Sequence, residues 1–82
     1  MANDEFRRAL CSSIAKILLE ERKKRELSLA SVATSAGLSR QMVRFVEQET
    51  RKPTFDTLLR ICDALEIDFE AVLKRAKRQV PK

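Results

Sequence analysis

The amino-acid sequence predicts an all-α domain, a compact bundle of five helices, on three observations. Apolar residues recur at helical spacing along the chain, and no segment alternates between apolar and polar residues as a half-buried strand does. The 82 residues also suffice for one domain and show no repeat or linker. We place this domain at residues 1–73 and expect the basic tail at 74–82 to be frayed.

The first predicted helix runs from about Glu5 to about Arg25. Asn3 or Asp4 can cap its start, where an acidic side chain suits the positive end of the helix dipole. Basic residues at its end suit the negative pole in the same way. The apolar stripe that should face the core consists of Phe6, Leu10, Ile14, Ile17 and Leu18.

The second and third predicted helices are short and are separated by a tight turn. Ser28 caps the second helix, and Ser39 caps the third, which runs to about Gln48. Gly37, the only glycine of the chain, follows the second helix and is expected to adopt the left-handed conformation that other residues resist. The buried face of the second helix consists of Leu29, Val32, Ala33 and Ala36.

The fourth and fifth predicted helices follow a loop at 49–53. Pro53 ends this loop and Thr54 caps the fourth helix. The fifth helix begins after Asp68. We expect the apolar stripe of the fourth helix to consist of Phe55, Leu58, Leu59, Cys62 and Leu65, and that of the fifth to consist of Phe69, Val72 and Leu73.

The composition favours an acidic partner and argues against catalysis. Seventeen Lys and Arg outnumber twelve Asp and Glu, so nucleic acid is the first partner to consider and an anionic membrane the second. The chain has no His, no glycine-rich phosphate loop and no acid pair in an evident cleft. We therefore expect no enzyme, no metal and no cofactor. Cys11 and Cys62 lie in apolar stretches and are interpreted as small core residues.

The sequence also predicts a cytoplasmic location without membrane association. No apolar run approaches the roughly 20 residues that a membrane-spanning helix needs. The polar start of the chain lacks the apolar centre of a signal peptide. Two thiols in a small basic protein fit a reducing compartment better than a disulfide scaffold.

Two short helices joined by a tight glycine-containing turn form a helix-turn-helix unit, here at about residues 28–48. The second helix of such a unit can enter the major groove of DNA. At about 100° per residue, one set of side chains on this helix falls within an arc of roughly 140° and an apolar set lies opposite. The first set is Arg40, Gln41, Arg44, Phe45 and Gln48, and the second is Ser39, Met42, Val43 and Val46.

The first set has suitable chemistry for reading bases. Arg can donate two hydrogen bonds to guanine, Gln can pair with adenine, and an aromatic ring can touch a thymine methyl group. We therefore expect Arg40, Gln41, Arg44 and Phe45 to contact bases, with the first two reaching deepest. Two alternatives are that this is an ordinary solvated face, and that Phe45 packs against a neighbouring side chain or a partner subunit.

The segment from about Ile14 to Leu73 resembles the Cro and lambda-repressor-like family of helix-turn-helix regulators, also called the XRE family. The matching residues keep the spacing of the family pattern without insertion or deletion. They are Arg22, Leu27, Ser28, Val32, Ala33, Gly37, Leu38, Ser39, Val43, Val46, Glu47, Pro53, Leu58, Leu59, Ala64 and Leu65.

The resemblance implies a lambda-repressor-like five-helix fold and a dimer that binds a two-fold DNA operator to repress or activate transcription. Restriction-modification controllers and repressors are among the small members of this family. The resemblance also implies an ion pair between the first and third helices, here Arg22 with Glu47. We interpret this pair, like Gly37, as structural.

Phosphate contacts are expected from helix N-termini and from the loop after the third helix. The candidates are Ser28, Ser39, Gln48, Arg51 and Lys52. The chain departs from the family where relatives often have glycine, because it has Glu26, Glu49 and Glu66 there. It also has Leu29 where relatives often have a polar residue, and Glu49 brings a carboxylate close to the expected DNA backbone.

The expected partners are double-stranded DNA and a second copy of the chain. Half-sites one helical turn apart would lie about 34 Å from each other. The candidates for the subunit contact are Ile67, Phe69, Val72 and Leu73, for which ordinary core packing is the alternative. The competing function is a protein-interaction module, such as an antitoxin domain with a protein partner and weak DNA binding. A steep salt dependence would distinguish a DNA-binding protein from such a module.

Overall fold

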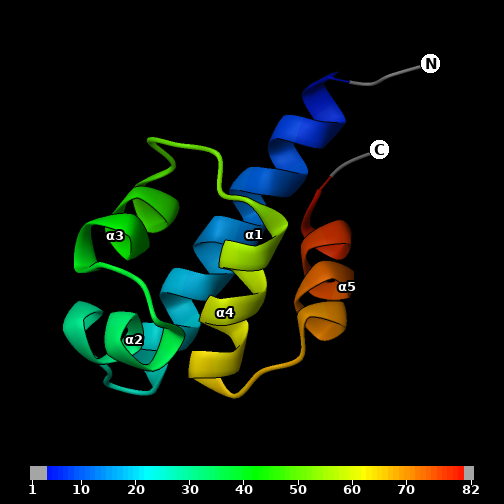
Figure 1. The fold of residues 1–82 in the computed structure, drawn as a ribbon. Coiled ribbons are helices and arrows are strands. Elements are labelled where there is room, and N and C mark those ends of the chain that lie inside the picture. Colours follow the sequence, from blue (N-terminus) through cyan, green and yellow to red (C-terminus); the bar gives the residue numbers. More distant parts are fainter. Residues whose placement is uncertain (1–3, 81–82) are drawn as a thin grey trace.

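The computed structural model describes residues 4–80, and five helices follow one another along this range (Figure 1). The all-α prediction is therefore confirmed. The longest helix, α1, runs through the middle of the molecule, with α2 and α3 on one side of it and α5 on the other. The bounds are α1 Asp4–Lys24, α2 Leu29–Ala36, α3 Arg40–Gln48, α4 Phe55–Leu65 and α5 Phe69–Gln79.

One hydrophobic core joins all five helices. Its most deeply buried side chains come from α1, α2, α3, α4 and α5 alike, which explains how short helices that are marginal in isolation become stable together. The core includes Ile17, Leu18, Val32, Val43, Val46, Ile61, Cys62, Leu65, Val72 and Ala76. Cys62 is buried as predicted, but the prediction for Cys11 is wrong, because this thiol is exposed on α1.

The predicted N-caps of the three middle helices are confirmed. The hydroxyl oxygens of Ser28, Ser39 and Thr54 accept hydrogen bonds from backbone N–H groups three residues later, at 3.0, 3.0 and 3.1 Å. Asp68 precedes α5 but makes no such side-chain bond. Asp4 is the first described residue and already belongs to α1, while Asn3 lies outside the described range.

Four helices end in the same way. A residue with left-handed backbone conformation follows the helix, and the N–H of the next residue donates a hydrogen bond to the carbonyl five positions earlier. Gly37 takes this conformation at φ 69°, but Glu26, Glu49 and Glu66 take it at 55°, 60° and 58°. The five-residue bonds join Leu27 to Arg22, Leu38 to Ala33, Thr50 to Phe45 and Ile67 to Cys62. Three of the four turns therefore hold a glutamate where glycine is most favourable, and its carboxylate lies at the negative end of a helix dipole.

Replacing Glu66 with Gly should raise the free energy of unfolding by about 0.5–1 kcal/mol, because it removes left-handed strain and an unfavourable charge at the end of α4. Urea denaturation measures this change. The matched control is Glu70→Gly, which makes the same substitution in the first turn of α5, removes a favourable charge there and should destabilise the protein by about 1 kcal/mol. If both variants destabilised the protein equally, the claim that the backbone is strained at residue 66 would be contradicted.

The structure corrects the expected boundary after Leu73. α5 continues to Gln79, and its last turn is anchored by Ala76 and Val80, which are 0% and 7% exposed. The Ser13 hydroxyl also donates a hydrogen bond of 2.6 Å to the Gln79 side chain. Residues 74–80 are therefore part of the folded domain, because two small apolar side chains among many basic ones continue the buried stripe.

A charged cluster fastens α5 to α1. The buried carboxylate of Glu21 accepts hydrogen bonds from Arg25, in the turn just after α1, and from Arg75 of α5, the latter at 2.8 Å. Arg75 also donates to Glu20 at 3.1 Å. The hydrogen bonds from Arg25 and then Arg75 lower the pKa of Glu21 from 4.5 to about 2.

The contribution of Glu21 to stability should depend on pH. Because its pKa is lower in the folded state, this contribution is complete above about pH 4.5 and is lost as the pH falls towards 2. Glu21→Gln should cost about 1.5–3 kcal/mol at pH 7, and its deficit relative to wild type should shrink near pH 2. Thermal unfolding followed by circular dichroism measures both. Glu20→Gln is the control, since its side chain is 62% exposed and a change below about 1 kcal/mol is expected. A deficit independent of pH would contradict this assignment.

Candidate nucleic-acid interface

The turn between α2 and α3 fixes how these helices are placed. Gly37 donates its N–H to Thr34, and Leu38 donates to Ala33, which closes the end of α2. Arg60 of α4 donates from Nη1 to the Ala36 carbonyl at 3.3 Å. A Cβ on residue 37 would lie 3.1 Å from that nitrogen. Glycine is thus favoured by its positive φ and by the close approach of Arg60.

α3 has one buried face and one exposed face. Val43 and Val46 point into the core and are 0% and 2% exposed. The side chains of Arg40, Gln41 and Arg44 are exposed and make no hydrogen bond or ion pair with another residue in the range 4–80. The outer face of the second helix of the unit therefore presents free donors and acceptors.

A bidentate ion pair holds α3 against α1. Arg22 donates from Nε and Nη2 to the two carboxylate oxygens of Glu47, at 2.7 and 3.0 Å. Its Nη1 donates to the Leu27 carbonyl at 2.9 Å, in the turn before α2. The two side chains are only 14% and 9% exposed. One guanidinium thus connects α1, α3 and the start of the helix-turn-helix unit.

The ring of Phe45 is covered by another side chain of the protein. The guanidinium carbon of Arg51 lies 4.5 Å from the centre of the Phe45 ring. Such cation–π contacts hold an Arg side chain in one orientation. Phe45, which the sequence placed with the base-contacting residues, is half-buried and supports Arg51 in this structure.

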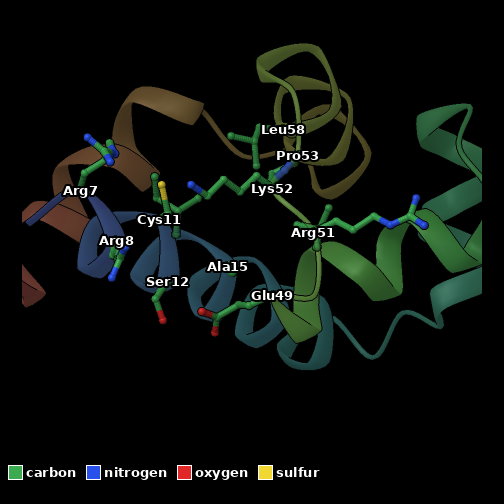
Figure 2. Close-up of a pocket in the computed structure, with 12 residues that line it drawn as sticks. Arg7, Arg8, Cys11, Ser12, Ala15, Glu49, Arg51, Lys52, Pro53 and Leu58 are labelled. Atoms are coloured by element: carbon green, nitrogen blue, oxygen red, sulfur yellow. The ribbon is translucent and has the colours of Figure 1, made fainter. Parts of the chain in front are cut away.

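The predicted phosphate-contacting residues are all exposed, but they do not form one cluster. Ser28 and Ser39 lie at the N-termini of α2 and α3, whose first turns contain no acidic residue, unlike those of α1, α4 and α5. Gln48 ends α3. Arg51 and Lys52 project in opposite directions from the α3–α4 loop, the first towards α3 and the second towards Cys11 of α1 (Figure 2).

The residues proposed for a subunit contact differ in burial. Val72 is 4% exposed and belongs to the core, so it offers no surface to a partner. Ile67, Phe69 and Leu73 are half-buried against the core. Among residues 4–80, two large apolar side chains are exposed, and the sequence missed both because it placed them in the buried stripe of α4. These are Phe55 and Leu59, at 62% and 38% exposure. The Phe55 ring packs edge-on against Phe69, with centroids 5.3 Å apart.

Other kinds of site find no support in the part of the chain that the structure describes. No three His, Cys, Asp or Glu side chains among residues 4–80 are grouped as a metal site would require. None of the helices in this range combines the length and the apolar character needed to cross a membrane.

Comparison with known proteins agrees with this geometry. A family model described as helix-turn-helix, of the XRE and Cro type, matches residues 18–72. The fold is similar to the crystal structure of a point mutant of the restriction-modification controller protein C.Esp1396I, with a TM-score of 0.79 and 18% sequence identity over 85% of this chain and 91% of that chain. A search of curated proteins gave no match. The family consists of DNA-binding domains and is not one of enzymes. The chain belongs to this helix-turn-helix family of DNA-binding domains.

Proposed function

We propose that this chain is a sequence-specific regulator of transcription that binds double-stranded DNA with α3 in the major groove. The observation that carries the proposal is the exposed and unpaired set Arg40, Gln41 and Arg44 on the outer face of α3. Arg and Gln are the side chains that read guanine and adenine through paired hydrogen bonds. Arg40 and Gln41 lie in the first turn, which approaches the bases most closely in such complexes.

Arg40 and Arg44 lie one helical turn apart on the outer face of α3, and both lack an acidic partner among the described residues. Arg7, Arg60 and Arg75 are exposed or partly exposed, yet each makes an ion pair with a carboxylate. No acidic side chain in the described range approaches the two arginines on the outer face of α3 in this way. Unpaired guanidinium groups on one helix face are suited to an external anion or base edge.

Phosphate contacts would flank this face. The oxygens of Ser28 and Ser39 accept backbone hydrogen bonds within their caps, which leaves each O–H able to donate to a phosphate. The helix dipoles of α2 and α3 favour an anion at the same ends. Arg51, held over Phe45, and the exposed Gln48 would contact the backbone beyond the other end of α3. We assign Lys52 only a general electrostatic contribution.

We also propose that the protein binds a two-fold operator as a homodimer, as a repressor or a restriction-modification controller. The exposed Phe55 and Leu59, with Phe69, supply an apolar surface on α4 and α5 rather than on α3. Large exposed apolar side chains that adjoin each other commonly mark an interface. A contact between copies through this surface would leave both α3 helices free for DNA.

Phe55→Glu should weaken dimerisation about tenfold or more without unfolding the chain, because it buries an unpaired charge only in the dimer. Sedimentation velocity at matched concentrations measures the change, and Lys16→Glu, at an exposed position of α1, is the control. A variant that dimerises like wild type would show that the contact lies elsewhere.

Selection from a random pool of duplex DNA at moderate salt, followed by sequencing, tests the function. Enrichment of an inverted repeat is the expected result, and binding should fall steeply with salt, with a log–log slope near −0.9 per phosphate neutralised. Retention without enrichment would contradict sequence reading. No retention would contradict DNA binding and favour the protein-interaction module.

A further inference from the structure

A groove lies between the N-terminal half of α1 and the loop that joins α3 to α4 (Figure 2). Its volume of about 420 Å³ is in the range of small-molecule sites, roughly 300–1,000 Å³. The floor and walls are largely apolar and include Ile14, Ala15, Val46, Pro53 and Leu58. None of these side chains belongs to the proposed DNA-contacting set.

Basic side chains surround this apolar floor. Arg7 and Arg8 of α1, and Arg51 and Lys52 of the loop, outnumber one acid, Glu49. Arg51 turns away from the groove to cover Phe45, whereas Lys52 extends across it towards Cys11. The side chains of Lys52 and Arg8 make no ion pair or hydrogen bond with any residue that the structure describes.

An unpaired ammonium group beside an apolar groove defines the chemistry of an occupant. A molecule with one anionic group and a compact apolar body would satisfy Lys52 and cover the apolar walls at the same time. An anion without an apolar body would satisfy only the charge. The volume of about 420 Å³ fits a small molecule, since ligand pockets commonly span roughly 300–1,000 Å³.

We propose that this groove binds a small amphipathic anion, such as a medium-chain carboxylate, with its charged group at Lys52 and its apolar body against Ile14, Val46 and Leu58. The loop that forms one wall follows α3 directly and contains Arg51. An anion bound there would reduce the positive charge beside the DNA surface. Ligand binding is therefore expected to weaken DNA binding, and this last step rests on the proposed function.

The chain contains its own reporter for the groove. Cys11 lines the groove and is exposed, while Cys62 is buried. Burial also raises the pKa of the Cys62 thiol to about 11, so its reactive thiolate is scarce at neutral pH. Iodoacetamide should thus alkylate Cys11 selectively, and mass spectrometry of the intact chain gives the rate.

The test measures alkylation of Cys11 in the absence of DNA, with decanoate below its micelle concentration as the probe. Decanoate should slow alkylation, and the same concentration of acetate or inorganic phosphate should not. Lys52→Gln should raise the half-protecting decanoate concentration about tenfold, as expected for removal of a charge-assisted hydrogen bond. Lys16→Gln, which removes an exposed α1 lysine outside the groove, should leave it unchanged.

Failure of decanoate to protect Cys11, equal protection by acetate, or undiminished protection in Lys52→Gln would each overturn the proposal. With the selected duplex, decanoate should weaken DNA binding of the wild type about fivefold and that of Lys52→Gln much less. Unchanged affinity would overturn the regulatory part alone. Because alkylation is measured without DNA, failure of the site and failure of the proposed function are distinguishable.

Discussion

Replacement of Arg22 with Met should lower the free energy of unfolding by about 3–5 kcal/mol, the cost of leaving a buried carboxylate without its partner. Glu47 is 9% exposed and both of its oxygens accept from Arg22. The Leu27 carbonyl would lose its donor as well. Denaturant unfolding of the isolated protein measures this decrease, and DNA binding should fail only to the extent that the chain unfolds.

The double variant Arg22→Met, Glu47→Leu is the matched control. It removes the unpaired charge and should recover most of the stability, because apolar side chains of similar volume can replace a buried ion pair at little cost. Recovery should be incomplete, since the Leu27 carbonyl remains without its donor. A decrease below about 1 kcal/mol in the single variant would show that the pair behaves as an exposed one.

Replacement of Arg40 and Gln41 by Ala should leave stability nearly unchanged and weaken binding to the selected operator by about 1–3 kcal/mol for each side chain that reads a base. Both side chains are exposed and unpaired, and Ala is a good helix former. Fluorescence anisotropy on operator and on unrelated duplex measures the effect, which should be much larger on the operator.

Arg78→Ala is the control for charge. Arg78 is an exposed α5 residue with no partner in the described range, so its removal should lower affinity little and equally on both duplexes. If the Arg40 and Gln41 variant bound the operator as tightly as wild type, the assignment of base contacts to the first turn of α3 would be wrong.

The starts of the three middle helices and the turn at Gly37 were predictable from sequence because local chemistry determines them. Ser28, Ser39 and Thr54 cap helices with their own hydroxyls, and Gly37 allows the positive φ that the turn requires. Both features depend on residues a few positions apart. The apolar face of α3 was predictable for the same reason, since Val43 and Val46 lie one helical turn apart.

The stripe of α4 was only partly predictable. With Ile61 and Thr57 included, the centre of the buried face rotates towards Leu65, and Phe55 and Leu59 fall roughly 80° and 120° away from it. Both then lie at the edge of the stripe, where they are exposed. The positions of all residues around α4 indicate that Phe55 and Leu59 lie away from the buried face, whereas the most apolar residues alone do not.

Contacts between distant residues were not predictable from local pattern. Arg75 contacts Glu21, which lies 54 positions earlier in the chain. This contact and the buried Ala76 hold residues 74–80 in the fold, although their basic composition alone predicts a frayed tail. The stacking of Arg51 on Phe45 and the opposite course of Lys52 likewise depend on loop conformation. The sequence therefore identified which loop residues carry charge, and the structure shows that the side chains of Arg51 and Lys52 point in opposite directions.

The central claim is that α3 reads bases in the major groove. Its most direct test is a double-mutant cycle, in which protein side chains and base atoms are removed separately and together and the binding free energy is compared. In the selected operator, the purines contacted by Arg40 and Gln41 are replaced by 7-deazapurines, which lack the N7 acceptor. Wild-type protein should lose about 1–3 kcal/mol of binding free energy on this duplex, whereas the Arg40→Ala, Gln41→Ala variant should lose almost nothing further. Equal decreases for both proteins, or no decrease for wild type, would contradict the claim.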